Sequence, residues 1–346
     1  MISILQFFDR TLRRFFMPFS MVCLCYGTLE AQPVATKNSA GTIVFYNLEN
    51  FFDWHDDADK KDEDFLPESG RRWNAYRYQQ KLRRIQKVLA NIGGWELPLL
   101  MGFCEFEHRQ MLEDLAKSPL LWQGNYGIAH FESVDRRGID TGILYQRGFF
   151  KLLDQCAHAV VFDDGRQGRE ILEVQGILPS GDTLHVLVNH WSSRWSGEMA
   201  TVGKRKVYAE RVSEIYKNIR QQSPGHLFLS MGDFNDEPSD ASLQLLVQQT
   251  EGALHCLMDE AEEPTHYFRS AVEAWSCFDQ FWINRECWQH SGWQLSAGKA
   301  FRPSWLLNDD GTPFRTFRGF AYEGGFSDHL PIYLRISPSP IVKAPH

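Results

Sequence analysis

Short apolar runs recur along the chain, and most of them have the composition of β-strands. Residues 42–48 are mainly β-branched and aromatic, which favours a strand. Residues 97–104 form a nearly continuous apolar run, as expected of a strand buried on both faces. The same criteria predict the remaining strands at 138–145, 171–178, 183–189, 226–231, 276–284 and 329–336.

Helical spacing of apolar residues is clearest at 76–92, where they recur every three or four positions. Gly93-Gly94 follows this segment and ends the predicted helix. Three more helices are predicted at 108–117, 200–218 and 239–249.

The order of these elements indicates the fold class. The strands at 138–145, 171–178 and 183–189 follow one another without a helix between them. We therefore expect an α/β protein in which two sheets pack on each other and the helices lie outside. A single doubly wound parallel sheet is the alternative, although it would require helices between successive strands.

Composition supports one large folded domain. The 346 residues are 43% hydrophobic and 14% aromatic, which is enough apolar material for a sizeable core. No internal linker or fixed-period repeat interrupts the chain, so we predict a single domain over 42–336. The formal net charge of −8 argues against tight, non-specific binding to a nucleic-acid backbone, unless positive charge gathers on one face.

The N-terminus resembles a targeting segment. Arg10, Arg13 and Arg14 precede a short apolar run, and the small residue Ala31 follows it. This pattern predicts a signal peptide at 1–31 and a secreted or periplasmic protein with no stable membrane span after its removal. An uncleaved anchor helix is the alternative, but the apolar run is short for a bilayer.

Cleavage at that point would leave five cysteines, so at least one thiol would be unpaired or would pair between chains. No Cys-x-x-Cys spacing remains, which argues against a zinc–thiolate site. Cys104 and Cys277 lie within apolar runs and are expected to be small buried hydrophobic residues.

Polar residues able to bind a metal or a phosphate follow six of the apolar runs. Binding sites are commonly built where strands end at one edge of a sheet. The residues concerned are Asn47, Glu105, His190, Asp233 with Asn235, Asp279, and Asp328 with His329.

The segment Gly232-Asp233-Phe234-Asn235 has the most distinctive pattern. In an extended chain Asp233 and Asn235 would point to one side and Phe234 into the core. A carboxylate and an amide on one face could position a water molecule and a phosphoryl oxygen. An Asx-turn around a core Phe explains the same residues equally well.

The segment Ser327-Asp328-His329 offers a carboxylate beside an imidazole. Asp279 is a suitable partner for His329, because a buried carboxylate can fix the tautomer and orientation of an imidazole. Taken alone, the segment is better explained by a capped loop with a solvated His.

Taken together and in this order, the six motifs resemble the endonuclease/exonuclease/phosphatase family, the DNase I-like fold. The resemblance covers about residues 42–336. It is closest to a secreted bacterial branch with a Tyr-Asn-Leu-Glu-Asn-Phe-Phe-Asp segment, here 46–53, and an Asn-His-Trp-Ser-Ser-Arg segment, here 189–194. It implies a four-layer α/β/β/α sandwich of two mostly antiparallel sheets.

The resemblance also implies a role for each motif in metal-dependent attack of water on phosphorus. Glu105 would be the principal ligand of Mg²⁺ or Mn²⁺, with Ca²⁺ as a further possibility, and Asn47 and Asp328 would assist it. Asp233 and Asn235 would orient water and phosphate. His329, held by Asp279, and His190 would contact the phosphate or transfer protons, with neither assigned as acid or base.

Three basic features are candidates for substrate binding. Arg169 resembles a family arginine that grips phosphate, and Arg194 could line the same rim. A surface or structural role is equally compatible with each. The cluster Arg315-Thr316-Phe317-Arg318 just before the last motif is a weaker candidate. His185 lies inside a strand pattern, which favours a structural role.

Three functions fit these features. The leading hypothesis is a monomeric nuclease that hydrolyses the phosphodiester bonds of DNA or RNA. A phosphatase or phospholipase-type esterase acting on inositol phosphates or sphingolipids is the second. A non-catalytic binding module on the same fold is the third, although all the expected catalytic positions are occupied.

Overall fold

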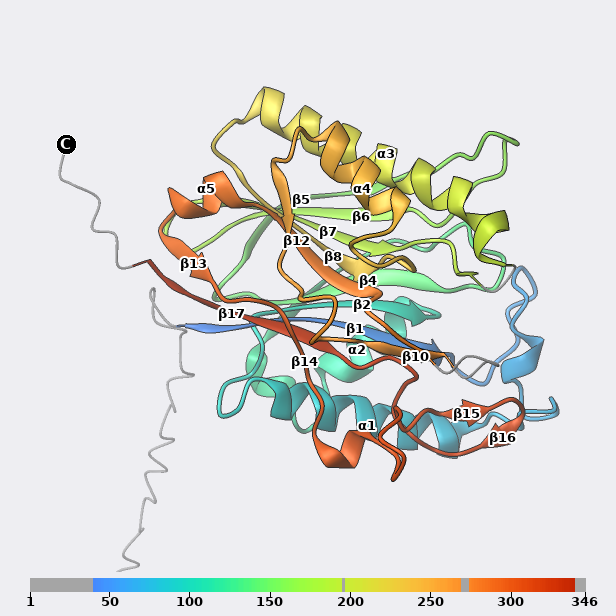
Figure 1. Ribbon diagram of the computed structural model, residues 1–346. Helices are drawn as coiled ribbons and strands as arrows, with labels where there is room; N and C mark the ends of the chain where they lie inside the picture. Colours follow the sequence, from blue (N-terminus) through green and yellow to red (C-terminus); the bar gives the residue numbers. More distant parts are fainter. Residues whose placement is uncertain (1–39, 195–196, 269–273, 340–346) are drawn as a thin grey trace, which may run out of the picture. The chain divides into compact units, whose positions relative to one another are not determined.

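A computed structural model describes residues 40–194, 197–268 and 274–339 of the chain. The predicted signal peptide lies outside these residues. Within them, two β-sheets pack face to face, and helices cover the outer face of each sheet (Figure 1). The predicted sandwich is therefore confirmed, and the doubly wound parallel sheet is wrong.

The first sheet contains the N-terminal and C-terminal strands of the domain. Only β1 and β2 run parallel, and every other described pair in this sheet is antiparallel. Its strand order is β13 (Trp293–Leu295), β17 (Ile332–Pro338), β1 (Gly41–Phe51), β2 (Leu100–Phe106), β4 (Asp140–Gln146), β3 (Tyr126–His130), with β14 (Lys299–Ala300) also paired to β17.

The second sheet is built from the middle of the chain. Here β7 and β8 are the parallel pair, and the other described pairs are antiparallel. Its order is β5 (Lys151–His158), β6 (Ile171–Ile177), β7 (Thr183–His190), β8 (Leu227–Asp233), β12 (Asp279–Asn284), β9 (Leu254–Cys256). Two small hairpins lie outside the sheets: β10 (His266–Phe268) with β11 (Ala274–Ser276), and β15 (Phe317–Arg318) with β16 (Ala321–Tyr322).

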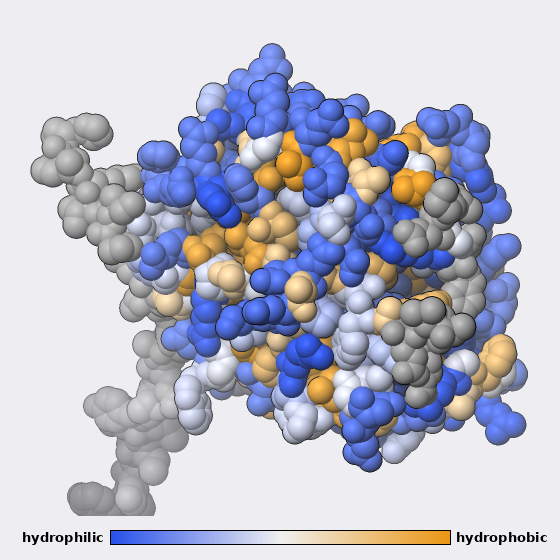
Figure 2. Space-filling view, viewed as in Figure 1, coloured by the Kyte–Doolittle hydropathy of each residue, from blue (hydrophilic) through white to orange (hydrophobic). Residues whose placement is uncertain are grey.

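Helices α1 (Ala75–Ile92) and α2 (Arg109–Ala116) cover the first sheet, and α3 (Glu198–Gln222) and α4 (Ala241–Gln249) cover the second (Figure 1). The short helix α5 (Arg285–Gln289) follows β12. Single 3₁₀ turns occur at Glu63–Phe65, Trp122–Gly124 and Ser304–Leu306. Hydrophilic residues dominate the face shown in Figure 2, and apolar residues appear there in smaller patches.

Three apolar clusters hold these layers together. The central cluster lies between the sheets and joins residues such as Phe45 and Leu100 to Val186 and Leu229. A second cluster packs α1 and α2 on the first sheet, and a third packs α3 and α4 on the second. Burial of these side chains is the main term that fixes the two sheets against each other.

The predicted strands are present, with differences at their ends. The run at 276–284 is divided, because the chain leaves the hairpin after Ser276 and joins the second sheet only at Asp279. Strand β5 escaped prediction because most of its side chains are exposed, so it lacks an apolar face. Among the described residues, no helix is both long and apolar enough to cross a membrane.

The state of the cysteines agrees with the expectation that at least one thiol is unpaired. Cys104, Cys156, Cys256, Cys277 and Cys287 are all free. Cys104 and Cys277 are fully buried in the central cluster, which confirms that they act as small hydrophobic residues.

Candidate active site

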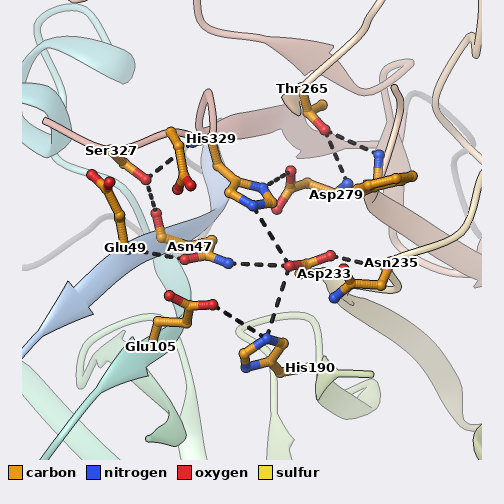
Figure 3. A network of polar contacts seen from close by, with 12 residues as sticks. Asn47, Glu49, Glu105, His190, Asp233, Asn235, Thr265, Asp279, Ser327 and His329 are labelled. Carbon is orange, nitrogen blue, oxygen red and sulfur yellow. Dashed lines mark hydrogen bonds and ion pairs between the residues drawn. The ribbon is translucent and has the colours of Figure 1, made fainter. Parts of the chain in front are cut away.

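The predicted polar residues meet at one edge of the sandwich, where strands from both sheets end (Figure 3). Parallel pairing brings the ends of β1 and β2 together in one sheet, and the ends of β7 and β8 together in the other. Antiparallel pairing then places Asp279, the first residue of β12, directly opposite Asp233, the last residue of β8. The two-sheet topology therefore gathers residues that lie far apart in the sequence.

The carboxylate of Asp233 lies at the centre of this network (Figure 3). Its Oδ2 accepts a hydrogen bond from Asn47 Nδ2 at 3.1 Å. The same oxygen is 3.9 Å from His190 Nε2 and 3.7 Å from His329 Nε2. Burial raises the pKa of Asp233 to about 7, although the charge on His329 opposes this. Asp233 can therefore carry or release a proton near neutral pH.

His329 is held by the predicted partner. Its Nδ1 lies 2.7 Å from Asp279 Oδ2, and the Asp279 side chain is fully buried. Burial alone would lower the pKa of His329, but the carboxylates of Asp279 and Asp233 outweigh it and hold that pKa well above its usual value. Its other ring nitrogen, Nε2, faces Asp233. Because the pKa of His329 is raised in this way, its side chain is an imidazolium at neutral pH.

His190 has the opposite electrostatic character. Burial and the positive charge of Arg169 lower the pKa of His190 well below its usual value. Its Nε2 is 3.5 Å from Glu105 Oε1, and its Nδ1 has no hydrogen-bond partner among the described residues. The site therefore combines one charged and one neutral imidazole around a single carboxylate. Groups with pKa values driven apart in this way are typical of acid–base chemistry.

Acidic residues form the side of the site that belongs to the first sheet. Glu105 Oε2 accepts a hydrogen bond from Asn50 N at 3.1 Å. Asp328 Oδ2 accepts one from Arg315 Nη2 at 2.8 Å. Burial would raise the pKa of Asp328, but Arg315 and the imidazole of His329, with smaller contributions from other basic groups, together outweigh it and the pKa is lowered. Asp328 therefore stays ionised at neutral pH, and the oxygen atoms of both carboxylates are suited to hard cations.

Sequence reasoning missed Glu49 and Lys81. Glu49 is buried, and its carboxylate accepts hydrogen bonds from Arg315 Nε at 3.2 Å and Thr316 N at 2.6 Å. Lys81 Nζ lies 3.9 Å from Glu49 Oε2, and burial lowers the pKa of Lys81 to about 8. The only available signal was a lysine at a position of α1 that faces the sheet.

The structure corrects the expectation of an extended Asp233–Asn235 segment. Asn235 has φ of 51°, and its backbone N–H donates to Asp233 Oδ1 at 2.9 Å, which is an Asx-turn. Its side chain donates to Trp191 O at 3.2 Å. Phe234 is fully buried against the second sheet, as predicted.

The side chains of Asn47 and Arg169 form hydrogen bonds within the protein. The Asn47 side chain accepts from Glu49 N at 2.9 Å as well as donating to Asp233. Arg169 donates to the carbonyls of His190 and Trp191 at 2.9 and 2.5 Å. These contacts favour positioning roles, and direct binding of metal by Asn47 or of phosphate by Arg169 stays a prediction.

The side chain of Arg194 also forms its contacts within the protein. Its Nε donates to Asn235 O at 2.8 Å, and its guanidinium also pairs with Asp236 and Asp240. The guanidinium lies 4.8 Å from the centre of the Phe278 ring. Arg194 thus stabilises the turn after β8. His185, by contrast, has the structural role expected of it, because Glu173 and His226 bond to its two ring nitrogens.

A cavity of about 400 Å³ adjoins the acidic side of the site. Asn50 and Asp328 line it together with Arg71, Arg315 and Arg318. Tyr267 and Phe317 add aromatic surface to its wall. The basic cluster at 315–318 therefore borders a pocket next to the reactive groups.

Comparisons with known proteins identify the family and the fold. A family model described as Endonuclease/Exonuclease/phosphatase family matches residues 42–338. A search of curated proteins finds no match.

Solved structures share the fold at low sequence identity. An endonuclease/exonuclease/phosphatase family protein from Bacteroides thetaiotaomicron is 15% identical with a TM-score of 0.57, over 88% of this chain and 100% of that chain. TDP2 from C. elegans is 14% identical with a TM-score of 0.55, over 86% and 75% respectively. The human Nocturnin catalytic domain with bound sulfate is 16% identical with a TM-score of 0.52, over 76% and 87%.

Proposed function

The chain belongs to the endonuclease/exonuclease/phosphatase family, and on that basis we propose that it hydrolyses phosphodiester bonds in nucleic acid. Membership makes it a metal-dependent phosphoric ester hydrolase. The observation that carries the proposal is the arrangement of His190 and His329, one neutral and one charged, on either side of Asp233.

Enzymes of this family use divalent metal ions, and the donors at this site fit one. Glu105 and Asp328 offer carboxylate oxygens, and Glu49 adds a third carboxylate whose charge acts on the same groups. Oxygen donors of this kind suit Mg²⁺ or Mn²⁺ better than softer metals. We propose that Glu105 and Asp328 hold the cation, which when bound would neutralise charge that develops on the phosphate.

The protein groups then divide the remaining work. Asp233, with a pKa of about 7, orients the attacking water and accepts its proton as the water oxygen bonds to phosphorus. The bond from phosphorus to the leaving oxygen breaks in the same step, and that oxygen takes its proton from solvent. The His329 imidazolium, fixed by Asp279, donates a hydrogen bond to a phosphoryl oxygen and stabilises the charge that forms there. His190, which is neutral, contacts the phosphate from the Glu105 side.

A nucleic-acid substrate is supported by the pocket beside the site. Arg71 and Arg318 add positive charge to Arg315, which is already paired with Glu49 and Asp328, and the partly exposed ring of Tyr267 can contact a base or sugar. Local positive charge of this kind offsets the net charge of −8. One of the structures with this fold is TDP2 from D. rerio complexed with a single-strand DNA product. The same pocket, at about 400 Å³, favours an inositol phosphate as the second candidate.

Export is part of the proposal. The basic and apolar pattern of residues 10–31 supports a secreted or periplasmic enzyme. The mass of the exported protein tests this: cleavage near Ala31 is expected, and an intact N-terminus would contradict it.

The experiment that tests the function is a substrate panel of DNA, RNA, phosphoinositides and sphingomyelin with Mg²⁺, Mn²⁺ or Ca²⁺. Chelation with EDTA should abolish hydrolysis, and Glu105→Ala should lower the rate by several orders of magnitude. Glu113→Ala, which removes an exposed glutamate on α2, is the matched control and should keep full activity. Hydrolysis that survives both EDTA and Glu105→Ala would refute the metal-dependent mechanism.

The same panel separates the two substrate classes. Cleavage of DNA or RNA should weaken steeply with salt, because binding releases counterions from the phosphate backbone. Preference for inositol phosphates, with nucleic acid left intact, would support the second candidate and refute the first.

A further inference from the structure

A second group of metal-competent side chains lies outside the catalytic network, beyond the ends of β1 and β2. It consists of Asp53, Glu107 and His108, which the sequence left without a role. Each residue offers one ligand atom, and these atoms all lie within 4.8 Å of one another. We propose that this group is a second divalent cation site, separate from the catalytic one and suited to Zn²⁺ or Mn²⁺.

Glu107 is the strongest evidence for the site. Its side chain is 1% exposed, and its Oε2 accepts a hydrogen bond from Asp53 N at 2.8 Å. Its other oxygen, Oε1, has no hydrogen-bond partner among the described residues and points into the group, 3.7 Å from His108 Nε2. A buried carboxylate oxygen left without a donor is costly unless a cation compensates it.

The second imidazole nitrogen of His108 supports the same conclusion. Nδ1 lies 3.5 Å from Glu132 Oε2, which leaves Nε2 directed toward Glu107. Histidines that bind metals usually donate their other ring nitrogen to a carboxylate in this way, because it fixes the tautomer and orientation. Glu132 thus acts as a positioning residue for the proposed ligand.

Negative charge accumulates around the group. Asp62 is also buried, and its Oδ1 likewise has no hydrogen-bond partner in the described part of the chain. Within residues 40–194, 197–268 and 274–339, neither Glu107 nor Asp62 pairs with a lysine or arginine, and the basic side chain beside Glu107 is His108, whose Nε2 lies 3.7 Å from Glu107 Oε1. A cation bound here would replace the positive charge that a protonated His108 supplies and would tie the acidic segment 53–64 to the end of β2.

The donor set decides the class of cation. Two carboxylates and one imidazole suit Zn²⁺ or Mn²⁺, whereas Mg²⁺ and Ca²⁺ prefer all-oxygen sites. Bond lengths to Zn²⁺ are about 2.0–2.2 Å, so the ligand atoms of a tetrahedral site are about 3.3–3.6 Å apart. The side chains of Asp53 and His108, 24% and 30% exposed, need to move inward by less than 1 Å, on the order of ordinary side-chain motion.

The two sites stay separate because the backbone turns between their glutamates. In a regular strand Glu105 and Glu107 would share one face. Glu105 instead has φ of 60°, and the pairing of β2 with β4 shifts between Cys104 and Phe106. As a result Glu105 faces Asn50 and His190, whereas Glu107 faces Asp53 and His108.

The test counts bound metal in the full-length chain by equilibrium dialysis against Zn²⁺ or Mn²⁺, followed by elemental analysis. Glu107→Gln keeps the size and the hydrogen bond to Asp53 N but removes the charge, and His108→Ala removes the imidazole. Each should bind one ion fewer than the parent, or bind that ion at least about tenfold more weakly. Glu113→Gln and His290→Ala change exposed residues of the same types elsewhere and should bind as the parent does.

Two further measurements keep the result independent of folding and of the catalytic site. Zn²⁺ should raise the melting temperature of the control variants but not that of Glu107→Gln, whose melting temperature without metal should equal or exceed that of the parent because the substitution removes an uncompensated buried charge. Glu105→Ala combined with Glu107→Gln should lose the Glu107-dependent ion in addition to any ion that Glu105 holds. Unchanged stoichiometry and affinity in both Glu107→Gln and His108→Ala, or an ion here that is only Ca²⁺ or Mg²⁺, would overturn the proposal.

Discussion

Replacement of Asp279 by Asn tests the electrostatic core of the proposed mechanism. The substitution keeps the shape of the side chain and an oxygen that can accept from His329 Nδ1, now 2.7 Å from Asp279 Oδ2. It removes the buried charge that, with Asp233, holds the pKa of His329 above its usual value. Without that charge, burial dominates and the pKa of His329 falls.

The expected loss of activity follows from the loss of the positive charge on His329. A neutral imidazole no longer places positive charge beside the phosphoryl oxygen, and loss of such a group costs about 10²- to 10⁴-fold in rate. A buried ion left unpaired would cost about 3–5 kcal/mol of folding free energy. His329 avoids most of that cost by releasing its proton, so the variant should fold and lose activity.

The assay is kcat/KM as a function of pH, together with the NMR titration of His329. Because the folded-state pKa of His329 is raised, its contribution is fully present below about 6.5 and is lost as pH rises through the folded pKa. The alkaline limb of the profile should therefore move to lower pH in Asp279→Asn.

Asp140→Asn is the matched control, because Asp140 is also buried and lies 2.6 Å from an imidazole nitrogen, Nε2 of His130. It should reduce stability and leave the alkaline limb in place. An unshifted limb and an unchanged kcat/KM in Asp279→Asn would refute the assignment of His329 as an imidazolium.

Two other predictions concern groups that support the site or the fold. Glu173 accepts from His158 and His185 at 2.6 and 2.7 Å, and although burial raises its pKa, these imidazoles lower it to about 2. The stabilisation that the Glu173 carboxylate provides is therefore present above a pH of about 4.5 and is lost as the pH falls toward about 2. Glu173→Gln should lower the free energy of unfolding, measured in urea, by up to about 3 kcal/mol at pH 7 and by much less at pH 3. An equal loss at both pH values would contradict this. In Arg169→Lys, the lysine lacks the guanidinium fork that binds the carbonyls of His190 and Trp191 at the end of β7. The variant should lower kcat about 10- to 100-fold and leave KM unchanged. A rise in KM alone would instead identify Arg169 as a phosphate ligand.

The strands that could be predicted from the sequence are those whose burial requires a continuous run of apolar residues. Strands β1, β2, β7 and β8 are buried on both faces, so each is an apolar run, and the residue type at its end marks the site. β5 is an exposed edge strand without such a pattern, and it was missed. The pairing of Asp279 with His329 was predictable because Asp279 lies in an apolar run and a buried carboxylate is a common partner of an imidazole.

Glu49 and Lys81 illustrate what a linear pattern does not contain. Lys81 lies on α1, and its Nζ donates to Glu49 O at 3.0 Å and also to the hydroxyl of Thr316. Arg315, from the segment after β14, approaches the same carboxylate. Three segments distant in sequence thus meet at one buried glutamate, and only the packing of α1 against the first sheet brings them together.

Backbone conformation at the rim explains why the site residues point as they do. Seven described non-glycine residues have positive φ, a conformation that costs about 1–3 kcal/mol each, and four of them lie at the site: Glu49, Asn50, Glu105 and Asn235. Side-chain hydrogen bonds offset this cost, because Glu105 accepts from the backbone N–H of Asn50. Asn47 and Asp233 accept in the same way from Glu49 and Asn235. The network that we propose for catalysis is therefore also the network that maintains the strained backbone, so removal of one carboxylate should displace its neighbours as well as delete a proposed ligand.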